Sequence, residues 1–162
     1  MSTRSLDNRG SSMKWFKVVT GVLVVGVAAI GLWLIIFGPP IDDSALNRHM
    51  QAFDEQAFAA AQADNQLILL NFHQSFCPAC QRQKRVLARY YIDFPDSHVR
   101  VFEIDYRASP ELARRFGAAN ATTLVMFRGE QRIWYNHGQT ETPAIYSALR
   151  EAEYHTRLFE LD

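Results

Sequence analysis

The feature that most constrains this chain is an apolar run near its N-terminus, residues 18–37. The run reads VVTGVLVVGVAAIGLWLIIF and contains no charged side chain. As a helix it would span roughly 30 Å, the thickness of the hydrocarbon core of a bilayer. A globular domain built from the rest of the chain has little room to bury a helix that is apolar on every side. The run therefore predicts a transmembrane helix.

The two flanks of this run differ in charge. Residues 1–17 carry four basic residues against one acidic residue, whereas Asp42 and Asp43 follow the run. Since Lys and Arg are retained on the cytoplasmic side, we expect a cytoplasmic N-terminus and an exterior C-terminal part. A cleaved signal peptide is the alternative, but its apolar region would be shorter, about 7–15 residues, and would end in a small-x-small site. The run ends in IIFGPP, which favours an uncleaved signal-anchor.

These features divide the chain into four parts. The polar, Ser- and Arg-rich start predicts a cytoplasmic tail, disordered over residues 1–13. The parts are the tail (1–17), the transmembrane signal-anchor helix (18–37), a linker that begins with the helix-breaking Gly-Pro-Pro (38–43), and one exterior domain (44–162).

Helical and strand patterns alternate along the exterior domain. Helices are predicted over 44–63 with Ser44 as N-cap, over 78–91, from Ser109-Pro110 to about Phe116-Gly117, and from Thr142-Pro143 onward with Ile145, Leu149 and Ala152 facing inward. Strands are predicted over 67–72, 99–104, 123–127 and 132–136, the last two joined by a hairpin turn over residues 128–131. The order α-β-α-β-α-β-β-α predicts an α/β fold.

The chain has two cysteines, Cys77 and Cys80, in a C-x-x-C pattern that follows an apolar strand and opens a helix. Unpaired N–H groups and the helix dipole at this position stabilise a thiolate and should lower the pKa of Cys77. Pro78 suits the first helical turn, where no N–H donor is needed. Cys80 lies one turn further on and is expected to be less exposed. The pattern therefore favours thiol-disulfide exchange in which Cys77 attacks and Cys80 resolves the mixed disulfide.

The cysteine pair has two other interpretations. A structural disulfide would close only a very small loop and would add little stability. A metal site needs more ligands, and the two cysteines with His73 leave the coordination shell incomplete. No metal and no diffusible cofactor is predicted. The other histidines are read as surface or structural residues (His49, His98, His137, His155), and the net charge of zero points to no nucleic-acid partner.

With these residues in view, the region from about 44 to 153 resembles the thioredoxin-like superfamily. The segments that carry the resemblance are FCPAC (76–80), VFEID (101–105), FG (116–117), TTLVMF (122–127) and GE (129–130). The CPAC pair and the membrane tether are similar to those of bacterial periplasmic thiol-disulfide exchange proteins. The resemblance implies a central mixed β-sheet flanked by helices, with Phe76, Pro78 and Ala79 as active-site neighbours of the cysteines.

The chain departs from this family at three positions. Thr122 stands where family members usually have a cis-proline facing the cysteines, so we expect a trans bond there and an altered docking loop for client peptides. Thr122 either places its hydroxyl near Cys77 and tunes the reactivity of that thiol, or merely continues the strand. Asn71 replaces a buried Asp and Val101 replaces the Lys that often partners it. Because Asn cannot titrate, proton transfer at the resolving thiol must use water or Glu103.

The leading hypothesis is a single-pass protein of the bacterial inner (cytoplasmic) membrane whose thioredoxin-like domain lies in the periplasm. It would exchange thiols and disulfides with protein partners, and the resemblance leans toward a reductase. The transmembrane run contains no cysteine, so a reductive role would need a separate membrane electron donor or relay protein. The alternative is a non-catalytic binding or assembly factor that keeps the fold with a structural disulfide.

Overall fold

The computed structural model describes residues 9–37 and 42–159. The chain forms two compact units, residues 1–39 and residues 40–162, and each is described by itself.

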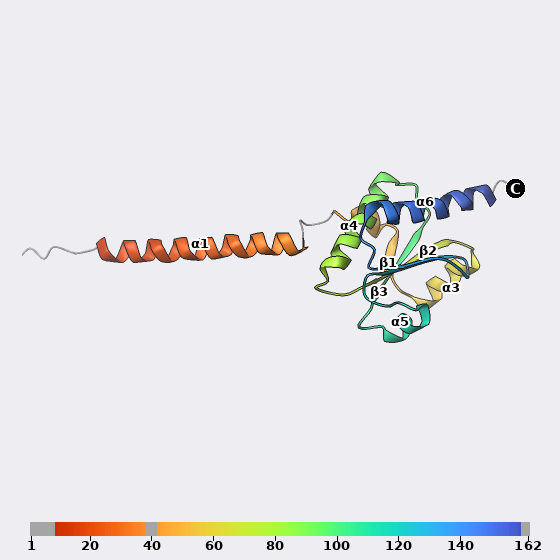
Figure 1. Cartoon of the computed structure of the whole chain (residues 1–162), viewed down its shortest axis with the longest axis horizontal. Coiled ribbons are helices and arrows are strands. Elements are labelled where there is room, and N and C mark those ends of the chain that lie inside the picture. The colour runs from red at the N-terminus through yellow and green to blue at the C-terminus, as the bar shows by residue number, and fades with distance from the viewer. Residues whose placement is uncertain (1–8, 38–41, 160–162) are drawn as a thin grey trace, which may run out of the picture. The chain divides into compact units, whose positions relative to one another are not determined.

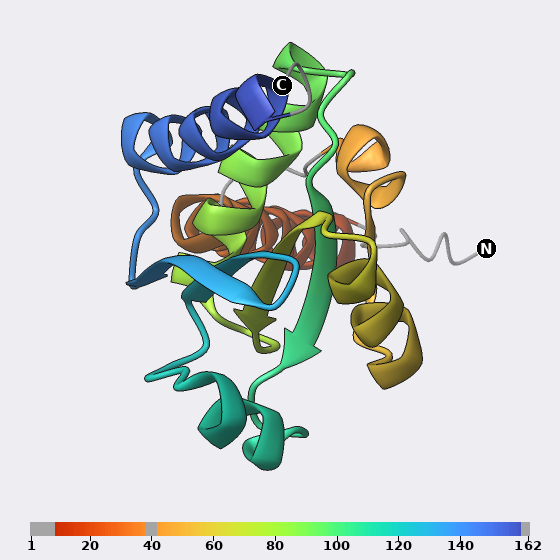
Figure 2. The same cartoon turned by 90° about the vertical axis from the view of Figure 1, so that its right-hand side faces the viewer.

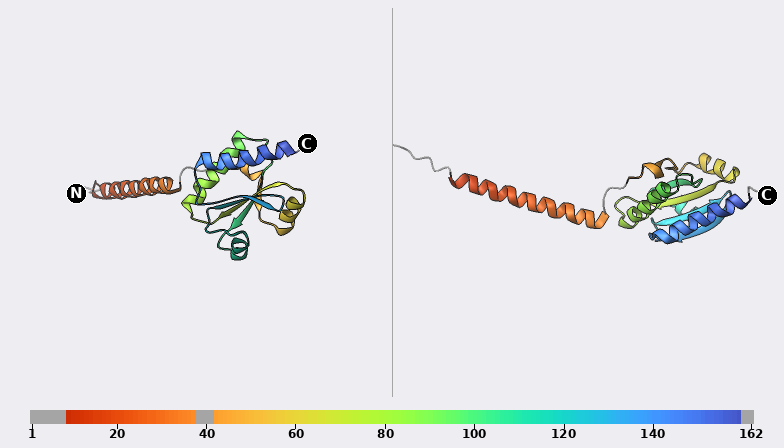
Figure 3. Two further views of the ribbon diagram at one scale, coloured as in Figure 1. Left: turned by 45° about the vertical axis from the view of Figure 1, so that its right-hand side comes forward. Right: turned by 90° about the horizontal axis from the view of Figure 1, so that it is seen from above.

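The first unit is a single helix, α1 (Arg9–Phe37), which Figure 3 shows without interruption. Within it, Trp15–Ile35 has a mean hydropathy of 2.6, and the side chains of its most apolar window are not buried against the protein. By length and composition this helix can cross a membrane. The predicted disordered tail was wrong from Arg9 onward, because a helix that has already formed extends at little cost. Residues 1–8 and most of the predicted linker lie outside the described residues.

The second unit is an α/β domain, as the sequence predicted (Figure 1). Its elements are α2 (Ser44–Asn47), β1 (Met50–Ala52), α3 (Glu55–Ala63), β2 (Leu67–His73), α4 (Pro78–Asp93), β3 (Arg100–Asp105), α5 (Pro110–Phe116), β4 (Thr123–Arg128), β5 (Gln131–His137) and α6 (Thr142–Phe159).

The sheet is mixed, with the strand order β1-β3-β2-β4-β5. β1, β3 and β2 are parallel, whereas β4 is antiparallel to β2 and β5 is antiparallel to β4. In the central strand, Asn71 lies opposite Glu103 of β3 and Leu124 of β4. The hairpin between β4 and β5 turns at Gly129, whose φ of 52° is a conformation that favours glycine.

The helix predicted over 44–63 is interrupted in the structure. Asp43 is the N-cap of the short α2, and a separate helix, α3, begins after Asp54, whose carboxylate accepts the Ala57 N–H at 2.8 Å. Between the two helices, β1 pairs with β3, with Met50 opposite Val101. A three-residue strand leaves no local period, because its extended conformation is fixed by a partner far along the chain.

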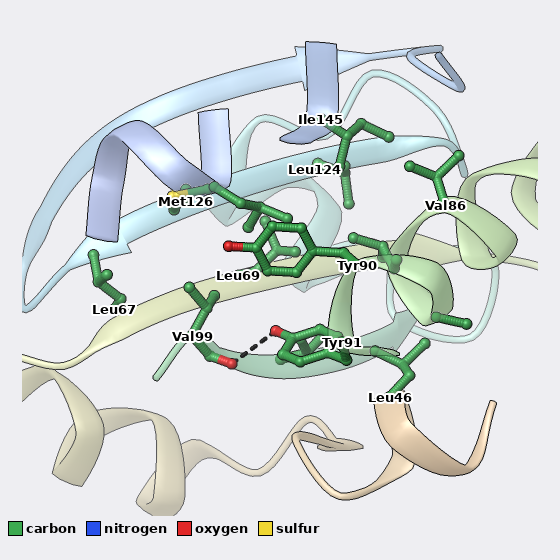
Figure 4. Close-up of a cluster of buried hydrophobic side chains, with 14 of the residues drawn as sticks. Leu46, Leu67, Leu69, Val86, Tyr90, Tyr91, Val99, Leu124, Met126 and Ile145 are labelled. Carbon is green, nitrogen blue, oxygen red and sulfur yellow. Dashed lines mark hydrogen bonds between the residues drawn. The ribbon is translucent and has the colours of Figure 1, made fainter. Parts of the chain in front are cut away.

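Helices cover both faces of the sheet (Figure 2). Each face carries its own hydrophobic cluster. We call the side covered by α2, α4 and α6 the α4 face, and the side covered by α3 and α5 the α3 face. The α4 face buries Leu69, Tyr90 and Tyr91, and the Tyr91 hydroxyl donates to the Val99 carbonyl at 2.8 Å (Figure 4). Ile145, Leu149 and Ala152 of α6 pack on this face, as predicted.

One buried carboxylate joins the far ends of α4 and α6. Glu153 accepts hydrogen bonds from the Tyr90 hydroxyl at 2.8 Å and the Ser97 hydroxyl at 2.6 Å. The His98 N–H also donates to it, at 3.2 Å. Burial, reinforced by the bond to Glu153, raises the pKa of Tyr90 above its ordinary value. This network holds the two helices together and leaves the N-terminal end of α4 to the cysteines.

Candidate functional site

The cysteine pair lies where β2 passes into α4. β2 ends at His73, a short turn follows, and α4 begins at Pro78 with Cys77 as its N-cap. Pro78 at the first helical position fits because it has no N–H to leave unpaired. Cys77 and Cys80 are joined by a disulfide, and their Cα atoms are 5.2 Å apart. This is the arrangement that the C-x-x-C pattern predicted.

The two sulfur atoms have different surroundings. Cys77 is partly exposed, and its Sγ accepts the Cys80 N–H at 3.1 Å at the positive end of the helix dipole. Cys80 is only 6% exposed, and its Sγ lies 3.1 Å from the carbonyl oxygen of Ala121. In the disulfide this sulfur has no hydrogen, so the contact becomes a hydrogen bond only after reduction. The geometry therefore stabilises negative charge on Cys77 and a neutral thiol on Cys80.

Phe76, directly before the pair, is the most exposed part of the site. Its side chain is 89% exposed, and its φ of 56° lies in the left-handed region that bulky residues rarely adopt. Pro78 and Ala79 fill the turn between the cysteines and are partly exposed. An aromatic side chain held away from the core beside the accessible sulfur is open to contact by another protein.

The loop before β4 faces Cys80. The bond before Thr122 is trans, as are the peptide bonds throughout the described residues. The Thr122 N–H donates to Asn120 Oδ1 at 2.9 Å, and the Thr122 carbonyl accepts from the Gly138 N–H at 2.9 Å. Both backbone groups of Thr122 are thus used within the domain, which differs from a loop that leaves them for an incoming peptide.

Asn71 lies in the central strand and is 3% exposed. Leu67 and Leu69 of the same strand pack on the α4 face, and the alternation of side chains along a strand puts Asn71 on that face too. The strand register places Glu103 directly beside it on β3 and places Val101 beside Leu69. Glu103 Oε1 lies 3.9 Å from His73 Nε2, and both side chains are partly exposed. A carboxylate is therefore present one strand away from the position where the resemblance leads us to expect a buried Asp.

Lys84 and Asp105, two charged groups near the site, have partners within the domain. Lys84 Nζ contacts Asp43 Oδ2 at 3.0 Å, and the side chain of Arg82 is exposed. Asp105, at the end of β3, accepts the N–H groups of Ala108 and Arg107 at 2.9 Å each, and these bonds lower its pKa. Within residues 9–37 and 42–159, no group of three or more His, Cys, Asp or Glu side chains is placed to hold a metal ion.

Sequence reasoning missed one residue of the site, Gln83. It follows Cys80 by three positions, lies on the inward side of α4 with Val86 and Leu87, and is 1% exposed. Its amide nitrogen donates to the Thr122 carbonyl at 3.2 Å. The available signal was a polar residue at a helical position whose neighbours one turn away point into the core.

Comparison with known proteins agrees with this geometry. The thioredoxin family model matches residues 49–151. The chain is 26% identical over 99 residues to a putative thioredoxin 2 of Streptomyces coelicolor. The aligned region covers 60% of this chain and 72% of that protein. It is also 24% identical over 100 residues to a thioredoxin of Chlamydia muridarum. That alignment covers 62% of this chain and 95% of that protein.

Solved structures give the same answer for the fold. Trxlp of Edwardsiella tarda superposes with a TM-score of 0.58 at 25% identity, over 62% of this chain and 97% of that one. Mitochondrial thioredoxin 3 of Saccharomyces cerevisiae, in its oxidised form, gives 0.55 at 18% identity, over 66% and 98%. With its mixed sheet and its Cys77–Cys80 pair at disulfide distance, this chain belongs to the thioredoxin family and is a redox protein of that family.

Proposed function

We propose that this protein is a membrane-tethered thiol-disulfide oxidoreductase that acts on protein partners through Cys77 and Cys80. The observation that carries the proposal is the asymmetry of the pair. Cys77 is accessible at a helix N-terminus, where its sulfur accepts an N–H, whereas Cys80 is buried behind it. An attacking thiolate needs access and stabilised charge, and a resolving thiol needs to be close but shielded.

In the reducing direction, the Cys77 thiolate attacks one sulfur of a client disulfide. The client S–S bond breaks, a mixed disulfide forms with Cys77, and one client sulfur leaves as a thiolate that takes up a proton. Cys80 then loses its proton and attacks the Cys77 sulfur, which releases the second client thiol. Two electrons pass to the client, and the protein is left with the Cys77–Cys80 disulfide that the structure contains.

Trapping tests the assignment of the two cysteines. In a Cys80→Ser variant the mixed disulfide cannot be resolved, so the full-length chain should accumulate covalent partners that appear on a non-reducing gel and disappear with reductant. Cys77→Ser is the matched control, because it removes the attacking sulfur and keeps the fold. The proposal fails if the Cys80→Ser lane is as clean as the control.

Removal of the proton from Cys80 needs a base, and Glu103 is the candidate. It lies beside Asn71 on the neighbouring strand and pairs with His73. Glu103→Gln should slow release of a trapped client while leaving formation of the mixed disulfide unchanged. If Glu103→Gln forms and releases the mixed disulfide at the wild-type rates, the proton acceptor is water and not Glu103.

We infer that α1 anchors the protein in the bacterial inner membrane, with its N-terminus in the cytoplasm and the thioredoxin domain in the periplasm. The helix is long and apolar enough, and the positive charge precedes it. Protease added to spheroplasts should digest the domain without lysis. Protection until the cells are lysed would reverse the orientation.

The direction of exchange is proposed as reductive. Neither cysteine lies in α1, so electrons must come from a separate membrane donor or relay protein. A reduction potential near about −270 mV for the full chain in detergent would support a reductase, and one near about −120 mV an oxidase. A pair that resists reduction below about −300 mV would be structural.

A second candidate function is a non-catalytic binding or assembly factor that keeps the disulfide. The observation that favours it is the Thr122 loop, whose N–H and carbonyl are bonded within the domain. Cells that carry the Cys77→Ser/Cys80→Ser double variant distinguish the two functions. Full function in those cells would support the binding factor and exclude the redox role.

A further inference from the structure

Gln83 is a buried amide on the helix that carries the cysteines. It is 1% exposed, and its neighbours on the inner side of α4 are apolar, among them Val86 and Leu87. Burying an amide costs free energy unless its polar atoms are bonded. The hydrogen bonds that this amide makes must therefore explain why a polar residue stands at this buried position.

The Gln83 amide nitrogen holds two loops at once. It donates to the Thr122 carbonyl at 3.2 Å and to the Gln139 carbonyl at 2.8 Å. Thr122 immediately precedes β4 and Gln139 follows β5, so one side chain fixes both strands at the open end of the β4–β5 hairpin to α4. The Gly138 N–H adds a further bond to the same Thr122 carbonyl.

This arrangement has a cost that packing alone does not explain. The Gln83 side-chain oxygen is buried and has no hydrogen-bond donor among the described residues. A leucine would fill a similar volume without that loss. The two bonds made by the nitrogen are thus what the glutamine provides.

The loop that Gln83 holds is the one that faces the resolving cysteine. The Ala121 carbonyl, next to Thr122, lies 3.1 Å from Cys80 Sγ. Reduction places a hydrogen on that sulfur, which can then donate to the carbonyl. Thr122 lacks the ring that fixes φ in a proline, so the position of this loop depends on its hydrogen bonds.

We infer that Gln83 is a positioning residue of the redox pair. By holding the Ala121–Thr122 segment against α4, it keeps a carbonyl in place for the Cys80 thiol. It thereby stabilises the dithiol form and keeps Cys80 protonated until a mixed disulfide forms. The inference rests on the proposed redox function, and it adds a residue through which this chain sets the balance between dithiol and disulfide.

The test is the equilibrium constant between the full chain and a glutathione redox buffer. In Gln83→Leu the Ala121–Thr122 segment loses its hydrogen bond to α4. The constant should therefore shift about two- to tenfold toward the disulfide, the range expected for one hydrogen bond. Gln83→Met keeps the length of the side chain and removes its donors, so it should give the same shift. It takes the place of Gln83→Leu if the leucine variant folds poorly.

Gln62→Leu is the matched control. The Gln62 amide nitrogen donates to the Gly129 carbonyl at 3.2 Å and so ties α3 to the turn of the same hairpin. Its loss should leave the glutathione constant unchanged. An unchanged constant in both Gln83 variants, or an equal shift in Gln62→Leu, would overturn the positioning role while leaving the proposed function standing. A wild-type pair that does not exchange with glutathione would overturn both.

Discussion

The two faces of the sheet are held by different interactions. On the α3 face, phenylalanine rings contact one another with centroids 5.4–6.4 Å apart (Phe53, Phe58, Phe72, Phe102, Phe116, Phe127). On the α4 face, buried polar groups bond across elements (Gln83, Tyr90, Tyr91, Glu153). Apolar packing tolerates small shifts, whereas hydrogen bonds fix positions. The cysteines lie on the face where positions are fixed.

The largest effect should follow from a break in the aromatic cluster. Phe58 is fully buried and contacts four other rings, so Phe58→Ala should lower the free energy of unfolding by about 3–5 kcal/mol. Urea denaturation of the domain measures this loss. The glutathione equilibrium constant of the cysteines should stay at its wild-type value. A large change in that constant would show that the two faces are not independent.

The next effect should come from the carboxylate on the α4 face. Glu153→Ala leaves the Tyr90 and Ser97 hydroxyls without their acceptor, which should cost about 2–3 kcal/mol of unfolding free energy. The neighbouring Glu151 is exposed, and Glu151→Ala is a control that should change stability little. Equal losses in the two variants, measured by urea denaturation, would contradict the role of the network.

The elements that sequence predicted well are those with strong local signals. α4 begins at a Pro after its N-cap, and α5 ends at Phe116, where Gly117 has the φ of 70° expected of a helix C-cap. The family resemblance rested on the same local segments. The position of Cys77 at a helix start needed nothing beyond them.

The features that the sequence did not predict depend on residues far away along the chain. β1 exists because it pairs with β3, about fifty residues later, and so it was absorbed into a predicted helix. Gln83 bonds to Thr122 and Gln139, which are 39 and 56 positions away. Whether a buried amide has partners is decided by tertiary packing. No local pattern could have identified them.

Alkaline pH offers a third way to separate the faces. Burial is the main cause that raises the pKa of both Tyr90 and Tyr91, so the folded state keeps their protons where the unfolded chain releases them. Their contribution to stability is complete below about pH 10 and is lost as pH rises toward the raised values. Each tyrosine should make the free energy of unfolding fall more steeply, by up to about 1.4 kcal/mol per pH unit. Urea denaturation across this range should show a shallower decline for Tyr90→Phe.

The smallest effect should come from the ion pair on the surface of the α3 face. Arg115 Nη1 lies 2.7 Å from Glu55 Oε2, but both side chains are largely exposed, so solvent and salt screen the attraction. Glu55→Gln should therefore cost no more than about 0.5–1 kcal/mol, and the difference should shrink as salt is added. Arg115 also lies 4.9 Å from the centre of the Phe116 ring. Arg115→Gln should cost slightly more than Glu55→Gln and keep part of its effect in high salt, because ring contact does not depend on the carboxylate. Identical, salt-sensitive losses would mean that the aromatic cluster gains nothing from the guanidinium above it.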